Sequence, residues 1–317
     1  MKNFSWQSGN GINYESHNRL RKHFMQPKEP MGEAWFMGEE RYLYNELQGD
    51  LANLSAYDLQ EPLREIASGT SSFGPMVEWH SWYHYLLVEL LPRSHESFVY
   101  SLLESLITGF MALYPDGVNT LPYKGFLDDV LLTLGSSIMD SRCWDESNII
   151  LGEILHRSNN NPNQVWCWWD ASGDFSASMF FCVKYLPYDN IEEWFRSVLA
   201  IQSPHWQAQV LVWLVGSNAI LSDSTQWPSE FLVESRPSID WDGSHCLNPS
   251  LISEEVTTAP FLPEASCNLI LKLVQSYFNE DVYLEWLSSI SSVSYLYAEL
   301  AEIPSVFEKL YVNVRNQ

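Results

Sequence analysis

The amino-acid sequence predicts an all-α fold, arranged as an irregular HEAT-like stack of antiparallel helix hairpins. Apolar residues recur every three or four positions over most of the chain, which is the period of an amphipathic helix. Alternating strand patterns are scarce, and Asn-Gly turns between β-rich runs are missing. The helical segments come in pairs joined by few residues, and such pairs pack antiparallel and can stack on their neighbours.

The composition is that of a globular protein. Of the 317 residues, 46% are hydrophobic, which is enough to fill a continuous core. The sequence has no run of about 18 uncharged apolar residues, so we expect no contact with a membrane. The N-terminus lacks an apolar secretion signal and the five cysteines form no CxxC pair, so we expect a cytoplasmic protein with reduced thiols.

Residues 1–30 are predicted to form an N-terminal arm. They are mostly polar, contain the basic cluster RLRKH, and end in a stretch with two prolines. Residues 31–317 are predicted to form a single helical-repeat domain. Its first amphipathic helices are expected over 32–54 and 56–68, where apolar residues follow the helical period.

The stretch PMVEWHSWYHYLL, which starts at Pro75, predicts a helix over 75–91. Proline suits the first turn of a helix, and Pro92 marks the end. Ser94 is then expected to cap a second helix over 95–114, so that the two helices form a hairpin. Three more hairpins are predicted from the same spacing: 121–138 with 144–157, 189–201 with 205–221, and 264–278 with 280–290.

His80 and His84 stand four residues apart on the helix predicted over 75–91. This spacing could place two imidazoles on one metal ion, but the HExxH motif needs a glutamate where Ser81 stands. Glu78 and Glu89 fall on the opposite edge of the helix, so neither adds a ligand on the histidine face. We therefore expect both histidines to pack without metal, and we expect no cofactor.

Residues 222–263 interrupt the helical pattern. The segment contains five prolines, seven acidic residues and one base, and it is far longer than an ordinary loop. Its tryptophans can anchor an interface, and its carboxylates can pair with lysine and arginine on a partner. The predicted partner-binding residues are Trp227, Glu230, Glu234, Asp240, Trp241, Asp242, Glu254 and Glu255.

Charge is the strongest compositional signal. Forty acidic residues against 17 bases give a net charge of −23, which repels phosphate backbones and attracts cationic surfaces. Direct binding of nucleic acid is therefore disfavoured, and a basic protein partner is favoured. The acidity of many soluble proteins serves solubility alone, so this second interpretation also stays open.

Two other classes of function remain as alternatives. A metal-dependent or thiol hydrolase would use His80, His84 or Cys246, although the stretch DWDGSHC places its polar residues too close in sequence for an ordinary catalytic triad. The chain has no GxSxG, Walker-type or GxGxxG motif. A helical scaffold that groups several peptides is the third possibility.

The stretch EWHSWYHYLLVELLPR, residues 78–93, resembles a Trp-rich helix ending in Leu-Pro-Arg in uncharacterised all-helical bacterial proteins. In size and acidity the chain also resembles the immunity proteins of bacterial toxin systems. That resemblance implies binding of a cognate toxin domain and neutralisation by covering its active surface. It implies no cofactor and no catalytic residues.

Overall fold

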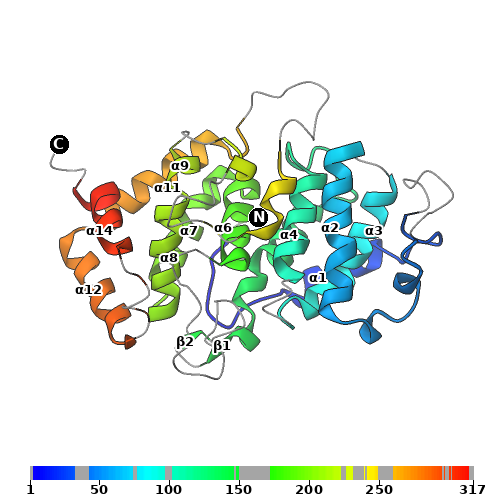
Figure 1. The fold of residues 1–317 in the computed structure, drawn as a ribbon, viewed down its shortest axis with the longest axis horizontal. Coiled ribbons are helices and arrows are strands. Elements are labelled where there is room, and N and C mark those ends of the chain that lie inside the picture. The colour runs from blue at the N-terminus through cyan, green and yellow to red at the C-terminus, as the bar shows by residue number, and fades with distance from the viewer. Residues whose placement is uncertain are drawn as a thin grey trace.

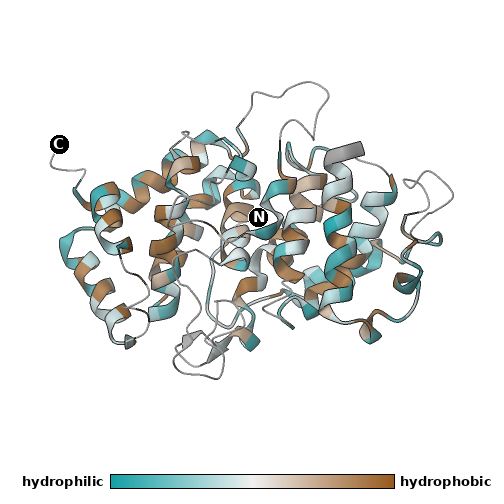
Figure 2. Ribbon diagram, in the orientation of Figure 1, coloured by the Kyte–Doolittle hydropathy of each residue, from teal (hydrophilic) through white to brown (hydrophobic). Residues whose placement is uncertain are grey.

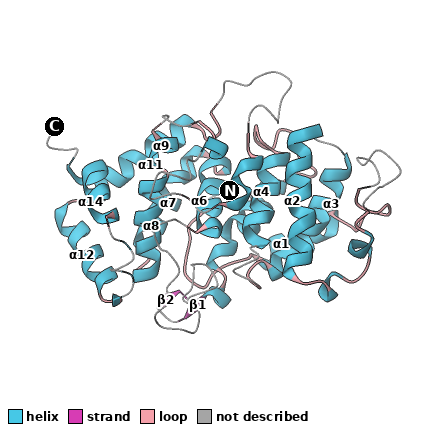
Figure 3. Cartoon of the chain, in the orientation of Figure 1, coloured by secondary structure: helices cyan, strands magenta, loops and turns pink. Residues whose placement is uncertain are grey.

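The structure is a computed structural model, and Figure 1 shows its helices side by side along the longest axis of the molecule. It describes residues 3–32, 43–73, 77–96, 102–145, 148–149, 172–222, 226–230, 239, 241–248, 260–294, 296, 300 and 302–313. The predicted all-α class is confirmed, since helices dominate these residues and a single short strand pair accompanies them (Figure 3). The α-helices are α1 Tyr14–His23, α2 Ala56–Phe73, α3 Val77–Leu90, α4 Leu102–Leu113, α5 Phe126–Thr133, α6 Gly173–Tyr185, α7 Tyr188–Ala200, α8 Pro204–Gly216, α9 Asn218–Leu221, α11 Glu264–Tyr277, α12 Glu280–Ser291 and α14 Ile303–Phe307.

Shorter elements connect the α-helices. Among the described residues, eight of them are short 3₁₀ or π-helical segments and two are strands. The 3₁₀ turns are η1 Asn45–Gln48, η2 Leu51–Asn53, η3 Leu91–Arg93, η4 Leu134–Met139, η5 Ser141–Cys143, η6 Pro228–Glu230 and η7 Asp242–Cys246, and η8 Glu308–Val312 is a π-helical turn. The strands β1 Trp144–Asp145 and β2 Asn148–Ile149 pair antiparallel, with Trp144 opposite Ile149.

Helices α2, α3 and α4 pack together as the centre of the N-terminal half. Every residue of α4 is buried, which agrees with its apolar residues on all sides. Figure 2 shows hydrophobic residues in brown and hydrophilic residues in teal along this and the neighbouring helices. Gly109 of α4 lets the helix approach Tyr83 closely, since a Cβ there would lie 2.8 Å from the Tyr83 ring. The predicted helix over 75–91 is confirmed as α3, and its partner is α4.

The N-terminal residues are part of the core. Phe4 and Trp6 are each 2% exposed, and the Trp6 indole N–H donates to the Gly135 carbonyl at 3.0 Å. On α1, Arg19 pairs with Asp129 of α5 at 2.6 Å. The segment 1–30, which the sequence presents as an arm, therefore contributes a packed helix and two core aromatics within its described residues.

Three local predictions are wrong. The helix expected over 32–54 is not continuous, because residues 43–54 form the separate turns η1 and η2 on either side of Gly49. Ser94 does not cap a helix that begins at residue 95, because both residues lie in a turn after η3, and the Ser94 hydroxyl bonds that of Ser137 at 2.9 Å. The residues that begin the helix expected over 144–157 form β1 and β2 instead, and the rest of that range lies outside the described residues.

The C-terminal predictions hold more closely. Helices α7, α8 with α9, α11 and α12 fall within a residue or two of the expected ranges. Asn279 caps α12 by accepting the Val282 N–H at 2.9 Å, and Ser203 caps α8 with Pro204 as its first residue. The described part of 222–263 contains no α-helix, as expected. Among the described residues, no helix has the length and apolar content needed to cross a membrane.

Candidate functional site

The two tryptophans predicted to bind a partner are core residues in this structure. Trp241 is 3% exposed, its indole N–H donates to the Thr108 hydroxyl at 2.9 Å, and its ring stacks on Phe180. Trp227 is 5% exposed and packs against Phe261. Both rings therefore fix the irregular segment to the helices, and a partner would reach them only if that packing opened.

The acidic residues of the same segment divide into two groups. Glu230 accepts the backbone N–H groups of Gln226 and Trp227 at 2.8 and 3.0 Å, and Asp242 forms an ion pair with Arg64 of α2. Both carboxylates therefore hold local structure although they are exposed. The remaining predicted residues lie outside the described residues: Glu234, Asp240, Glu254 and Glu255.

Turn η7 brings a thiol and an imidazole together in a cavity of about 310 Å³ between α2 and α4. The Cys246 sulfur lies 3.4 Å from His245 Nε2, although these residues are adjacent in sequence. His245 Nδ1 lies 2.7 Å from the Asp242 carbonyl oxygen, which can only accept, so Nδ1 carries the proton. In a neutral ring Nε2 is then free to accept the thiol proton.

The electrostatics of this pair do not favour thiolate chemistry. Burial, together with the nearby Asp242 carboxylate, raises the pKa of the Cys246 thiol to about 11. Burial also raises the pKa of Glu65, which lines the same cavity. Reactive cysteines have a lowered pKa, so the Cys246 thiol stays protonated at neutral pH and is a weak nucleophile.

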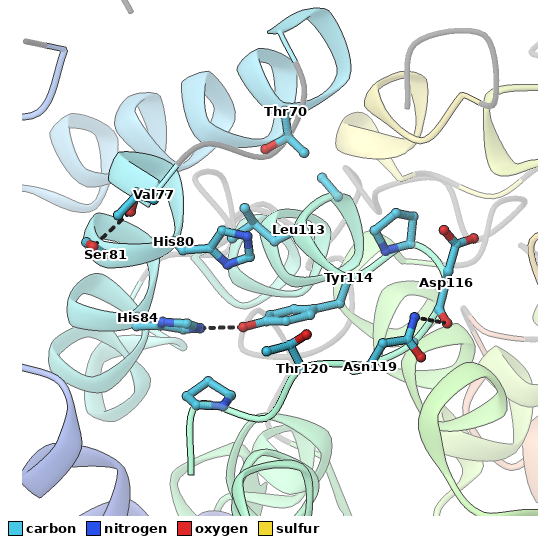
Figure 4. Close-up of a pocket in the computed structure, with 14 residues that line it drawn as sticks. Thr70, Val77, His80, Ser81, His84, Leu113, Tyr114, Asp116, Asn119 and Thr120 are labelled. Atoms are coloured by element: carbon cyan, nitrogen blue, oxygen red, sulfur yellow. Dashed lines mark hydrogen bonds between the residues drawn. The ribbon is translucent and has the colours of Figure 1, made fainter. Parts of the chain in front are cut away.

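A second cavity, of about 560 Å³, lies between the start of α3 and the turn after α4 (Figure 4). His84 is 6% exposed, and its Nε2 is hydrogen-bonded to the Tyr114 hydroxyl at 2.8 Å. His80 lies one turn earlier, half-buried, with its ring edge-to-face on Tyr114 at 5.4 Å between centroids. Asp116 and Asn119 complete the opposite side, where the Asn119 amide donates to the Asp116 backbone carbonyl.

Burial keeps both histidines of this cavity neutral. The pKa of His84 is lowered to about 3 by burial and, to a smaller degree, by His80, and burial lowers the pKa of His80 as well. Burial raises the pKa of Tyr114, so its hydroxyl keeps the proton that it shares with His84. The prediction that the two histidines pack on a helix describes His84 well, whereas His80 faces open space.

His84 also separates this cavity from a larger groove. Its ring stacks on Phe24 at 4.2 Å, and Phe24 lines a cavity of about 800 Å³ on the other side of α3. Met25 and Val77 are 80% and 85% exposed beside this groove. The start of α3 is therefore flanked by two hollows, both lined by Val77, Ser81 and His84.

Tyr114 and Asp116 were not predicted as site residues, but a signal for them exists in the sequence. An antiparallel hairpin places the end of its second helix beside the start of its first. The residues YPD, which start at the last residue of the helix predicted over 95–114, are therefore expected to approach His80.

In the part of the chain that the structure describes, no group of three or more His, Cys, Asp or Glu side chains could hold a metal ion. Comparison of the chain with models of protein families, with curated proteins and with solved structures found no match.

Proposed function

We propose that this chain is a cytoplasmic protein-binding protein whose acidic surface associates with a basic protein domain. In the form that we favour, the partner is a toxin domain and the chain is its immunity protein. The supporting observation concerns charge: every arginine that the structure describes is paired with a carboxylate, while many described carboxylates remain exposed. Binding then follows from long-range attraction to a cationic surface.

Within the described residues, six arginines contact carboxylates of the chain itself. Those on α1, η3 and η5 hold neighbouring elements together, and Arg93 also donates to the Leu51 and Leu54 carbonyls at 2.6 and 2.8 Å. A partner therefore meets little positive charge from these residues. The pairs are Arg19 with Asp129, Arg21 with Glu89, Arg64 with Asp242, Arg93 with Glu96, Arg142 with Asp140, and Arg196 with Glu192.

The C-terminal helices carry the greatest excess of exposed acid. Their described bases are Arg196, which is paired, and the exposed Lys272 and Lys309. This end of the molecule, where α12 and α14 lie in Figure 1, supports an interface better than the buried tryptophans do. The exposed acids on α7, α11, α12, α14 and its flanking turns are Asp189, Glu192, Glu193, Glu264, Glu280, Asp281, Glu285, Glu302 and Glu308.

The arrangement of these helices suits a binding surface. Helix α7 contacts α11, and α8 contacts both α12 and α14, so helices from separate stretches of the C-terminal half pack against one another. We propose that these layers form a degenerate HEAT-like stack, in which the outer helices present side chains to a partner. A scaffold that binds several peptides would use the same surface, and the number of partners distinguishes the two.

The test is capture of a partner from the native host at low salt, followed by association kinetics with the purified partner. The triple variant Glu193→Gln, Glu285→Gln, Glu308→Gln should slow association by about threefold to tenfold and flatten its dependence on salt. The matched control is Glu29→Gln, Glu46→Gln, Glu61→Gln, which removes the same charge from exposed positions in the N-terminal half.

Two results would overturn this proposal. In the first, no basic protein is captured at low salt. In the second, both triple variants slow association equally, which would mean that net charge acts without a defined surface. Neutralisation is tested separately, by measuring whether a stoichiometric amount of the chain abolishes the activity of the captured domain.

A further inference from the structure

The cavity between α3 and the turn after α4 has the chemistry of a ligand site. Its volume of about 560 Å³ falls within the usual range for small-molecule sites, about 300–1,000 Å³. Its walls are partly aromatic, formed by His80 and Tyr114, and partly polar, formed by Asp116, Asn119 and Thr120 (Figure 4). A largely apolar hollow with a few converging polar groups is typical of such sites.

The described lining is selective for charge. It contains one carboxylate, that of Asp116, and no lysine or arginine. Lys184 lies close enough to Asp116 for the carboxylate to raise its pKa, against the larger lowering by burial. Its ammonium group, however, contacts the Phe261 ring at 4.2 Å and donates to the Phe261 carbonyl. A phosphate or carboxylate in the cavity would therefore find no cationic partner in the lining.

Two polar groups of the lining, His80 and Asp116, can accept hydrogen bonds from a ligand. His80 makes no hydrogen bond to any other residue that the structure describes, so its unprotonated nitrogen can accept one from a ligand. The Asp116 carboxylate forms no ion pair within the described residues, and its backbone carbonyl already receives the Asn119 amide. Tyr114 is held rigidly, because its hydroxyl bonds His84 and its carbonyl accepts the Tyr185 hydroxyl at 2.7 Å.

We propose that this cavity binds an organic cation, whose cationic groups are held by the Asp116 carboxylate on one side and by the His80–Tyr114 ring pair on the other. Carboxylate and aromatic faces both attract such a group, and the acidic field of the whole chain concentrates it at the surface. The cation could come from a free small molecule or from an arginine side chain of the basic partner proposed above. The chemistry of recognition is the same in both cases.

The first experiment uses the chain alone, so it does not depend on the proposed partner. Agmatine, which carries a guanidinium and an ammonium group, is titrated to about 10 mM, a concentration that detects millimolar affinity, and the histidine ring signals are followed by NMR. We expect His80 to shift with saturation, and we expect no shift with glutarate, a dianion of similar length. Assignment comes from His80→Ala, which loses the shifting signal and weakens binding measured by calorimetry.

The charge requirement is tested by Asp116→Asn. Loss of one exposed ion pair should weaken agmatine binding by about twofold to fivefold. Asp189→Asn, at an exposed aspartate of α7, is the matched control and should bind agmatine as the unmodified chain does. The proposal is overturned if agmatine leaves His80 unshifted, if glutarate gives the same shift, or if Asp116→Asn binds with unchanged affinity.

A second experiment distinguishes the two sources of the cation. The association rate with the captured partner is measured with and without saturating agmatine. Competition assigns the cavity to an arginine or lysine of the partner, whereas simultaneous binding assigns it to a free small cation. Failure to capture any partner would overturn the proposed function but would leave the agmatine result intact.

Discussion

At the scale of single residues, His84 links the stability of the fold to pH. Its pKa is lowered to about 3 in the folded chain, mainly by burial, against 6.5 for an unburied histidine. Between these pH values His84 binds a proton in the unfolded chain but not in the folded chain. Its contribution to the free energy of unfolding is therefore fully present above pH 6.5 and is lost as the pH falls towards 3. The loss is about 1.4 kcal/mol per pH unit for each such group.

We therefore expect the free energy of unfolding to fall between pH 6.5 and pH 5, and we expect His84→Gln to reduce that slope by about one proton. Urea titrations at intervals across this window measure it. His95 and His205, whose pKa values burial lowers to about 4, keep part of the slope in the variant. Equal slopes for the variant and the unmodified chain would show that His84 takes up its proton without unfolding.

Single residues also show which side-chain contacts cannot be predicted from the sequence. Helical spacing predicted that His80 and His84 share one edge of α3, which the structure bears out. The Tyr114 partner comes from 30 positions away, and only the tertiary packing determines that contact. Trp241 is a similar case, because its hydrogen-bond partner Thr108 lies on a helix 133 positions earlier, and no local pattern distinguishes a core tryptophan from an interface tryptophan.

At the scale of elements, a glycine controls how closely α2 and α3 pack. A Cβ at Gly69 would overlap the six-membered ring of Trp79, which is 1% exposed and enclosed by the core. Gly69→Ala should therefore destabilise the chain by about 1–3 kcal/mol, although alanine is the better helix former by about 1 kcal/mol. The cost of the steric overlap exceeds the gain from helix propensity here, because the buried Trp79 ring has no space to move.

Urea unfolding of Gly69→Ala measures this difference. The matched control is Gly49→Ala between η1 and η2, where a Cβ would meet only the Glu46 carbonyl oxygen at 3.3 Å and the backbone φ is −82°. We expect that control to change stability by less than about 0.5 kcal/mol, as for most surface substitutions. An unchanged or raised stability for Gly69→Ala would mean that α2 and α3 can separate without cost.

Element prediction worked where the helix had both a clear period and a clear end. Helices α7, α11 and α12 have amphipathic patterns and recognisable first residues, and their bounds were predicted closely. Helix α6 was missed because it is buried on nearly every side, which removes the amphipathic period. The pair β1–β2 was missed because two-residue strands are too short to show alternation.

At the scale of the whole molecule, the charge of −23 both supports the proposed binding and opposes folding. Like charges repel in the compact state, and salt screens that repulsion, since the screening length falls from roughly 30 Å at 0.01 M to roughly 3 Å at 1 M. Salt also weakens the arginine pairs, but exposed pairs contribute only about 0–1 kcal/mol each. Screening of the repulsion should therefore outweigh the weakening of the ion pairs, so that added salt stabilises the folded chain.

We expect the melting temperature of the isolated chain to rise by about 1.5 °C or more when sodium chloride is raised from 0.01 M to about 0.5 M, which corresponds to a stabilisation of about 1 kcal/mol or more. Calorimetry on the chain and on Glu193→Gln, Glu285→Gln, Glu308→Gln measures it, and the variant should gain less because it has less repulsion to screen. A melting temperature that falls with salt would show that the ion pairs, led by the largely buried Asp129 with Arg19, outweigh the net charge. The acidic surface would then destabilise the fold little. In that case the large negative charge could be explained without a cationic partner.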